Sequence, residues 1–143
     1  MFAECDKKIK KEIPKAMSKI VISGYYGFAN AGDEAMLTAI IKALRSTEQD
    51  VELTVISGAP EITATRHKVT SIHRFNPWEL ISSLCSCDLL LSGGGSLLQD
   101  VTSKRSLLYY LFILALGIIF KKTVMLFAQG TRPINSAILR KLT

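Results

Sequence analysis

The sequence contains few of the residues that build metal centres or disulfide frameworks. It has three cysteines and two histidines among 143 residues. Cys85 and Cys87 are separated by a single residue, whereas structural zinc sites use a two-residue spacer and a second pair of ligands. We therefore expect reduced thiols, no bound metal and a cytoplasmic protein.

Long apolar runs and an amino-terminal signal are also missing. The apolar stretch from Leu107 to Phe120 is shorter than the roughly 18 to 20 residues that a membrane-spanning helix needs, and basic residues bracket it. No apolar segment follows the amino terminus before Ile20, so a secretory signal is not expected. We predict a helix that packs against a sheet, no membrane span, and at most a peripheral position near a membrane.

Positive charge is concentrated at the amino end. The net charge is +6, and residues 1–19 hold six lysines and three acids. These basic residues are not interleaved with aromatics, and no nucleic-acid-binding motif is present, so we expect no nucleic acid as a partner. Residues 1–18 are predicted to form a polar basic extension, and residues 19–143 a single folded domain.

Strand-like apolar runs alternate with helical patterns along the rest of the chain. The strand-like runs are Ile20–Ser23, Val51–Ser57, Val69–Arg74, Leu89–Ser92 and Val124–Gln129, and the helix-like segments are Glu34–Arg45, Pro77–Leu84, Ser103–Phe120 and a last piece from Asn135. The runs are continuously apolar, as in parallel strands that are covered on both faces. The pattern predicts the α/β class, with a Rossmann-like, doubly wound parallel sheet of about five strands.

A glycine-rich loop joins the first strand-like run to the first helical one. Its glycines, at positions 24, 27 and 32, fit neither GxGxxG nor the Walker loop, so we expect no dinucleotide or ATP cofactor. Ligands of open α/β sheets bind beyond the carboxyl ends of the strands. The candidate substrate-binding residues of this loop are Gly24, Asn30, Gly32, Asp33 and Glu34. The alternative is structural: Asp33 would cap the helix, and Glu34 would complement the helix dipole.

A second glycine-rich segment follows the fourth strand-like run. Consecutive glycines cost conformational entropy unless the backbone has a special task, such as contact with a ligand. The candidate substrate-binding residues of this segment are Gly93, Gly94, Gly95, Gln99, Asp100, Ser103 and Arg105. Asp100 is a candidate base toward a sugar hydroxyl, although Asp100 or Ser103 would equally serve as a helix cap. Arg105 falls in a first helical turn, where the dipole disfavours a cation and a nearby anion would explain it.

The two histidines have no visible partners in the sequence. His67 is expected in a loop and His73 at the edge of a strand. Because a catalytic base is identified by its geometry relative to its partners, neither histidine is assigned a role.

Four segments resemble the polysaccharide pyruvyl transferase family, in particular its bacterial cell-wall members. They are KIVISGYYGFANAGDEAML at 19–37, SGAP at 57–60, LLLSGGGSLLQDVTSKRSLLYYL at 89–111 and VMLFAQGTRPI at 124–134. Ala29 stands where the family usually shows glycine. The resemblance implies an enzyme that transfers pyruvate from phosphoenolpyruvate, as a ketal, to a sugar of a cell-wall polysaccharide or its lipid-linked precursor. It also implies a glycosyltransferase-B-like architecture of two Rossmann-like lobes.

The resemblance covers the first of those two lobes. In the family, the basic donor-binding residues and a catalytic histidine are attributed to the second lobe. Phosphoenolpyruvate is therefore expected to bind through a lobe that this sequence lacks, while the residues named above face the glycan or lipid-linked acceptor. No catalytic residue beyond the candidate Asp100 is assigned.

The carboxyl end of the sequence bears on whether the chain acts alone. It stops inside a helix-like segment without a stop signal, so we expect a truncated product. Two alternatives to an active enzyme stay open: a non-catalytic lobe that binds a glycan or nucleotide-sugar, and an inactive remnant. An apolar patch is expected where a second lobe would pack, which predicts self-association or a second-lobe partner.

Overall fold

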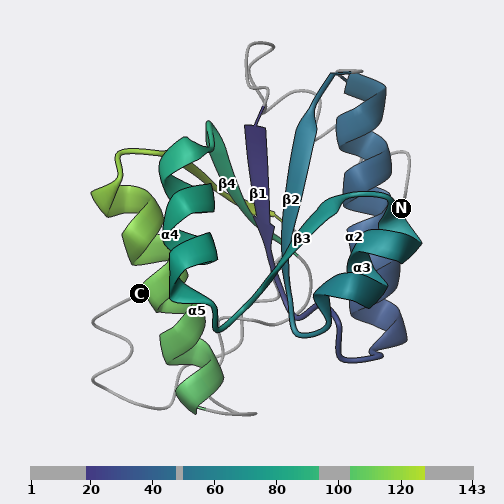
Figure 1. Ribbon diagram of the computed structural model, residues 1–143, viewed down its shortest axis with the longest axis horizontal. Coiled ribbons are helices and arrows are strands. Elements are labelled where there is room, and N and C mark those ends of the chain that lie inside the picture. The colour runs from purple at the N-terminus through teal and green to yellow at the C-terminus, as the bar shows by residue number, and fades with distance from the viewer. Residues whose placement is uncertain (1–18, 48–49, 94–103, 128–143) are drawn as a thin grey trace.

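The computed structural model describes residues 19–47, 50–93 and 104–127, which form a five-stranded sheet between two layers of helices (Figure 1). All paired strands are parallel, in the order β3-β2-β1-β4-β5. The elements are β1 (Lys19–Ser23), α2 (Ala31–Thr47), β2 (Glu52–Ser57), α3 (Pro60–His67), β3 (Thr70–His73), α4 (Pro77–Ser86), β4 (Leu89–Gly93), α5 (Lys104–Ile119) and β5 (Thr123–Phe127). The predicted Rossmann-like α/β class is confirmed.

The sheet is buried on both faces because successive side chains of a strand point to opposite sides. Helices α2 and α3 cover one face, and α4 and α5 cover the other (Figure 1). In β1, Ile20 and Ile22 pack in one core cluster with Leu37 of α2, whereas Val21 packs in the other cluster with Leu84 of α4. This two-sided burial explains why the central strands β1 and β4 appear in the sequence as continuous apolar runs.

Helix α3 is absent from the sequence-based prediction, which was wrong to place His67 in a loop. The buried residues of this helix are Thr63 and His67, both polar, while Ile62 is 58% exposed. A helix that buries polar side chains lacks the apolar period by which helices are recognised. Pro60, at its first turn, is the helix-start signal that the sequence did contain.

Helix α5 accounts for the long apolar stretch. Leu107, Tyr110 and Ile113 are buried, as expected for a helix that packs on a sheet, but Phe112 and Ile119 on the same helix are 56% and 68% exposed. Within the described parts of the chain, no helix combines the length and apolar character needed to cross a membrane. Residues 128 and 129 of the fifth strand-like run and the helical piece from Asn135 lie outside the described residues.

Candidate functional site

Both glycine-rich segments leave the sheet at the same place. Strands β1 and β4 are neighbours, and Ser23 pairs with Ser92 at their carboxyl ends. The chain winds away from these two strands in opposite directions, which makes this the switch point where ligands of open α/β sheets bind. The segments are in contact here, because a Cβ atom at Gly24 would lie 2.5 Å from the carbonyl oxygen of Gly93.

The β1–α2 loop also packs onto the turn that follows β2. Gly27 has a φ of +81°, and a Cβ atom there would collide with Ser57 Oγ and lie 2.5 Å from the backbone nitrogen of Ala59. Gly32 is different, since the nearest atom to a Cβ there would be Asn30 Oδ1 at 3.5 Å. The glycine at position 27 is therefore required by packing within the protein, whereas Gly32 is exposed at the edge of the sheet.

Helix α2 is capped by Asn30. Its Oδ1 accepts a hydrogen bond from the Gly32 N–H at 3.1 Å, and its backbone carbonyl accepts one from the Glu34 N–H at 3.0 Å. The alternative role of Asp33 as the cap is wrong, because α2 begins at Ala31 and Asp33 lies within its first turn. Burial, and secondly the charge of Glu34, raise the pKa of Asp33.

Glu34 anchors the β1–α2 loop through its side chain. Its Oε1 accepts a hydrogen bond from the Gly27 N–H at 2.9 Å, while its Oε2 lies 3.2 Å from His67 Nε2 and 3.5 Å from a guanidinium nitrogen of Arg66. The exposed fractions of the Glu34 and His67 side chains are only 11% and 4%. Burial by itself raises the pKa of Glu34, but the hydrogen bonds from Gly27 and His67 and the charge of Arg66 bring it below its ordinary value. These contacts assign Glu34 a positioning role and identify the partner of His67.

Two buried tyrosines lie behind the loops. The Tyr26 hydroxyl donates a hydrogen bond to the carbonyl of Gly93, which ties the two glycine-rich segments together. Tyr110 of α5 is 2% exposed, and its hydroxyl has no hydrogen-bond partner among the described residues. Burial raises the pKa of both tyrosines, so both hydroxyls keep their protons at neutral pH.

Arg74, the first residue after β3, is surrounded by aromatic rings. Its Cζ lies 5.1 Å from the centre of the Phe28 ring, 4.9 Å from that of Phe75 and 4.4 Å from that of Tyr109. The Tyr109 hydroxyl donates to the backbone carbonyl of Arg74 at 3.0 Å. We call these four residues the Arg74 cage. Sequence reasoning missed it, although a cation placed directly after a strand and beside an aromatic residue was a usable signal.

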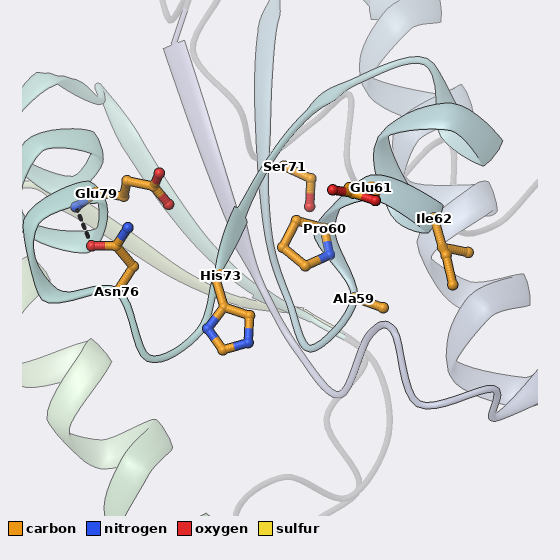
Figure 2. A pocket seen from close by; sticks show the side chains of 8 residues that line it. All are labelled: Ala59, Pro60, Glu61, Ile62, Ser71, His73, Asn76 and Glu79. Atoms are coloured by element: carbon orange, nitrogen blue, oxygen red, sulfur yellow. Dashed lines mark hydrogen bonds between the residues drawn. The ribbon is translucent and has the colours of Figure 1, made fainter.

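A pocket of about 440 Å³ opens next to the cage, between the starts of α3 and α4 (Figure 2). It is lined by Ala59, Pro60, Glu61, Ile62, Ser71, His73, Asn76 and Glu79. Asn76 caps α4 by accepting a hydrogen bond from the Glu79 N–H at 3.4 Å. His73 is the last residue of β3, as predicted, and its ring lies between Asn76 and Ala59 in Figure 2. The pocket thus brings together carboxylates, an imidazole, an amide and a hydroxyl.

The remaining candidates lie mostly outside the described residues. Arg105 is exposed on the first turn of α5. The other residues of that segment, Gly94, Gly95, Gln99, Asp100 and Ser103, lie outside the described ranges. Their assignment as substrate-binding residues, and that of Asp100 as a base, stays a prediction.

The fold and its edge site define the class of the protein as a Rossmann-like α/β domain with ligand loops at the switch point of the sheet. The sequence model described as polysaccharide pyruvyl transferase matches residues 30–143, and the chain belongs to that family.

Comparison with individual proteins adds little to the family match. No curated protein matches the chain significantly. A solved structure described as "Replication initiator DnaA bound to AMPPCP and single-stranded DNA" is similar at 14% sequence identity, over 97% of this chain and 42% of that chain, with a TM-score of 0.40. A structural similarity this weak does not establish a shared fold or function.

Proposed function

We propose that the chain forms the acceptor-facing lobe of a polysaccharide pyruvyl transferase that acts on a cell-wall polysaccharide or its lipid-linked precursor. The family match over residues 30–143 carries the proposal. The arrangement of the carboxyl edge supports it, because ligands of open α/β sheets bind at loops on this edge. The free thiols of Cys85 and Cys87 fit a reaction in the cytoplasm.

The reaction defines which groups the complete site must supply. Two hydroxyls of one sugar form bonds to C2 of phosphoenolpyruvate, C3 takes up a proton, and the bond from C2 to the phosphate oxygen breaks. One hydroxyl proton balances the proton gained at C3, and the other leaves with the phosphate. The site needs an acid for C3, a base for the hydroxyls, and cationic donors for the phosphate and carboxylate.

The pocket of Figure 2 has the chemistry of an acceptor site. Glu61 and Glu79 provide carboxylates that accept hydrogen bonds from sugar hydroxyls, and Asn76 and His73 add groups that donate or accept. Its volume of about 440 Å³ lies within the range of small-molecule sites. We assign this pocket, together with Asn30 of the β1–α2 loop and Asp33 of the first turn of α2, to the sugar acceptor.

The donor half of the reaction is tested by turnover. We expect the chain alone to release no phosphate from phosphoenolpyruvate in the presence of an amino-sugar disaccharide lipid analogue, followed by phosphorus NMR. Addition of a second lobe of the family in trans should restore phosphate release and ketal formation. Pyruvylated sugar formed by the chain alone would contradict the assignment of the donor to a second lobe.

The acceptor half is tested by calorimetry with the same disaccharide analogue. Glu79→Gln should weaken binding about tenfold, the loss expected for one charge-assisted hydrogen bond. The matched control is Glu52→Gln, because Glu52 is exposed at the amino end of β2, on the opposite edge of the sheet. Equal affinities of the two variants would show that the acceptor does not bind in this pocket. Binding without turnover in the presence of the second lobe would favour a non-catalytic binding lobe.

A further inference from the structure

The charge of Arg74 is not balanced within the described part of the protein. No described carboxylate forms an ion pair with it; the pairs seen there join Lys19 to Glu52, and Arg66 and His67 to Glu34. Its guanidinium is held instead by the three rings of the cage and by a hydrogen bond to the Tyr109 hydroxyl. Aromatic rings attract a cation and fix its orientation, but they do not use its N–H groups.

Two hydrogen-bond donors in this corner are buried and unpaired. The Nε of Arg74 and the hydroxyl of Tyr110 have no hydrogen-bond partner among the described residues. The ring centre of Tyr109 is 4.4 Å from Arg74 Cζ and 5.3 Å from the centre of the Tyr110 ring. Native proteins seldom leave buried donors without an acceptor. A guanidinium and a protonated hydroxyl together call for an acceptor that carries negative charge.

We propose that the Arg74 cage binds a phosphate-type oxyanion of a substrate. The planar guanidinium matches the spacing of two phosphate oxygens, and the Tyr110 hydroxyl supplies a third donor. Arg74 is half-buried, and two rings of its cage reach the protein surface, since Phe75 is 69% exposed and Phe28 is 40% exposed. No residue of the cage is among the predicted site residues.

The cage and the pocket of Figure 2 form adjoining parts of one edge. His73 lines the pocket, Arg74 is the centre of the cage, and the ring of Phe75 lies 6.0 Å from that of His73. This arrangement suits a ligand in which a sugar is attached to a phosphate. The inference thus deepens the proposed function, and two sources of the oxyanion follow from it: the phosphate of a sugar-phosphate acceptor, or that of phosphoenolpyruvate.

The first experiment measures binding without any turnover. The full chain is titrated with inorganic phosphate, phosphoenolpyruvate and UDP-N-acetylglucosamine, while the Nε–Hε resonance of Arg74 is followed by proton–nitrogen NMR. We expect this resonance to shift with all three probes. Tighter binding of UDP-N-acetylglucosamine identifies the acceptor as the source of the oxyanion. Tighter binding of phosphoenolpyruvate identifies the donor and would overturn its assignment to the second lobe.

Variants then separate binding from a purely structural role of the cage. Tyr110→Phe removes one hydroxyl and keeps the ring, so it should weaken phosphate binding about five- to tenfold and leave the fold intact. Arg74→Lys should weaken it by tenfold or more, since lysine lacks the planar fork. Arg45→Lys is the matched control, because Arg45 bonds the carbonyls of His67 and Lys68 away from this corner.

The outcomes distinguish this inference from the proposed function. Absence of any shift at Arg74 with millimolar probes, or equal affinities of Tyr110→Phe and Arg45→Lys, would overturn the oxyanion site. If Arg74→Lys does not fold, Tyr110→Phe decides the question. Failure of the reconstituted lobes to transfer pyruvate would overturn the proposed function and leave the binding result standing.

Discussion

The carboxylate of Glu34 and the imidazole of His67, 33 residues apart in sequence, lie 3.2 Å apart in a buried contact. The contact joins the first turn of α2 to the end of α3, and the same carboxylate accepts the Gly27 N–H. The β1–α2 loop is thereby held by two helices that lie on one face of the sheet. A ligand meets a loop that is already ordered, which reduces the entropy lost on binding.

Replacement of Glu34 by alanine should lower the free energy of unfolding by about 2 to 4 kcal/mol. The reason is that the Gly27 N–H and the His67 imidazole would lose a shared buried partner. Urea denaturation measures the change. Glu61→Ala is the control, since Glu61 is exposed and should shift stability by no more than about 0.5 kcal/mol. Equal effects of the two substitutions would contradict the structural role of Glu34.

Acid should remove the contribution of Glu34 to stability. Its pKa in the folded protein is lowered from the ordinary value of 4.5. The stabilisation is therefore fully present above the unfolded-state pKa and is lost as the pH falls through the lower folded-state pKa. The difference in unfolding free energy between the parent chain and Glu34→Gln should shrink between about pH 6 and pH 3. Comparison of the two proteins at each pH separates Glu34 from Asp33, whose raised pKa acts in the opposite sense. A constant difference would show that the Glu34 carboxylate makes no contribution.

Substitution by alanine should have opposite effects on stability at Gly27, in the β1–α2 loop, and at Gly32, in α2. Gly27→Ala should cost more than about 2 kcal/mol, because the new Cβ collides with Ser57 Oγ and the φ of +81° disfavours any side chain. Gly32→Ala should be neutral or stabilising by up to about 1 kcal/mol, since Gly32 lies in a helix and has open space around it. Thermal unfolding of the pair is the measurement. Similar melting temperatures would contradict the packing described for this loop.

Replacement of Ala29 by glycine should stabilise the protein. It has a φ of +58°, a left-handed conformation in which glycine carries no Cβ penalty. Ala29→Gly should raise the unfolding free energy by about 0.5 to 1 kcal/mol, whereas the control Ala35→Gly, within α2, should lower it by about 1 kcal/mol. A loss of stability at both positions would show that Ala29 is not strained. The left-handed backbone conformation thus explains why glycine would suit position 29.

The sheet was predictable because its strands follow a local rule. The central strands β1 and β4 are covered on both faces, so each appears in the sequence as an apolar run, whereas the edge strand β3 buries only Ile72. The alternation of strand-like and helical segments implies parallel pairing. Helix α3 was not predicted because its buried residues, Thr63 and His67, are polar. The cap of α2 was placed at Asp33 rather than Asn30 because either residue type suits a helix start, and three positions separate them.

The candidate site was predictable in its position but not in its chemistry. The two glycine-rich loops were expected beyond the carboxyl ends of their strands, and Gly24 and Gly93 do meet there. Arg66 and His67, which contact Glu34, come from a segment more than 30 residues away. Phe28 and Tyr109, which contact Arg74, are also more than 30 residues from it, and no local pattern encodes such contacts. In the sequence, Tyr110 resembles the apolar residues of its helix, and only the structure shows that its buried hydroxyl has no partner among the described residues.

The central position of β1 also determines when this strand can complete its pairing during synthesis of the protein. Lys19 and Asp88, joined by a hydrogen bond at the foot of β1 and β4, are 69 residues apart. At ribosomal speeds of about 5 to 20 residues per second, roughly 3 to 14 seconds pass between the synthesis of β1 and that of β4, the second of its two neighbours. During that interval, one edge of β1 is an open template for strand addition, on the nascent chain or on another. The yield of folded protein should therefore depend on translation rate and on chaperones that shield exposed strand edges.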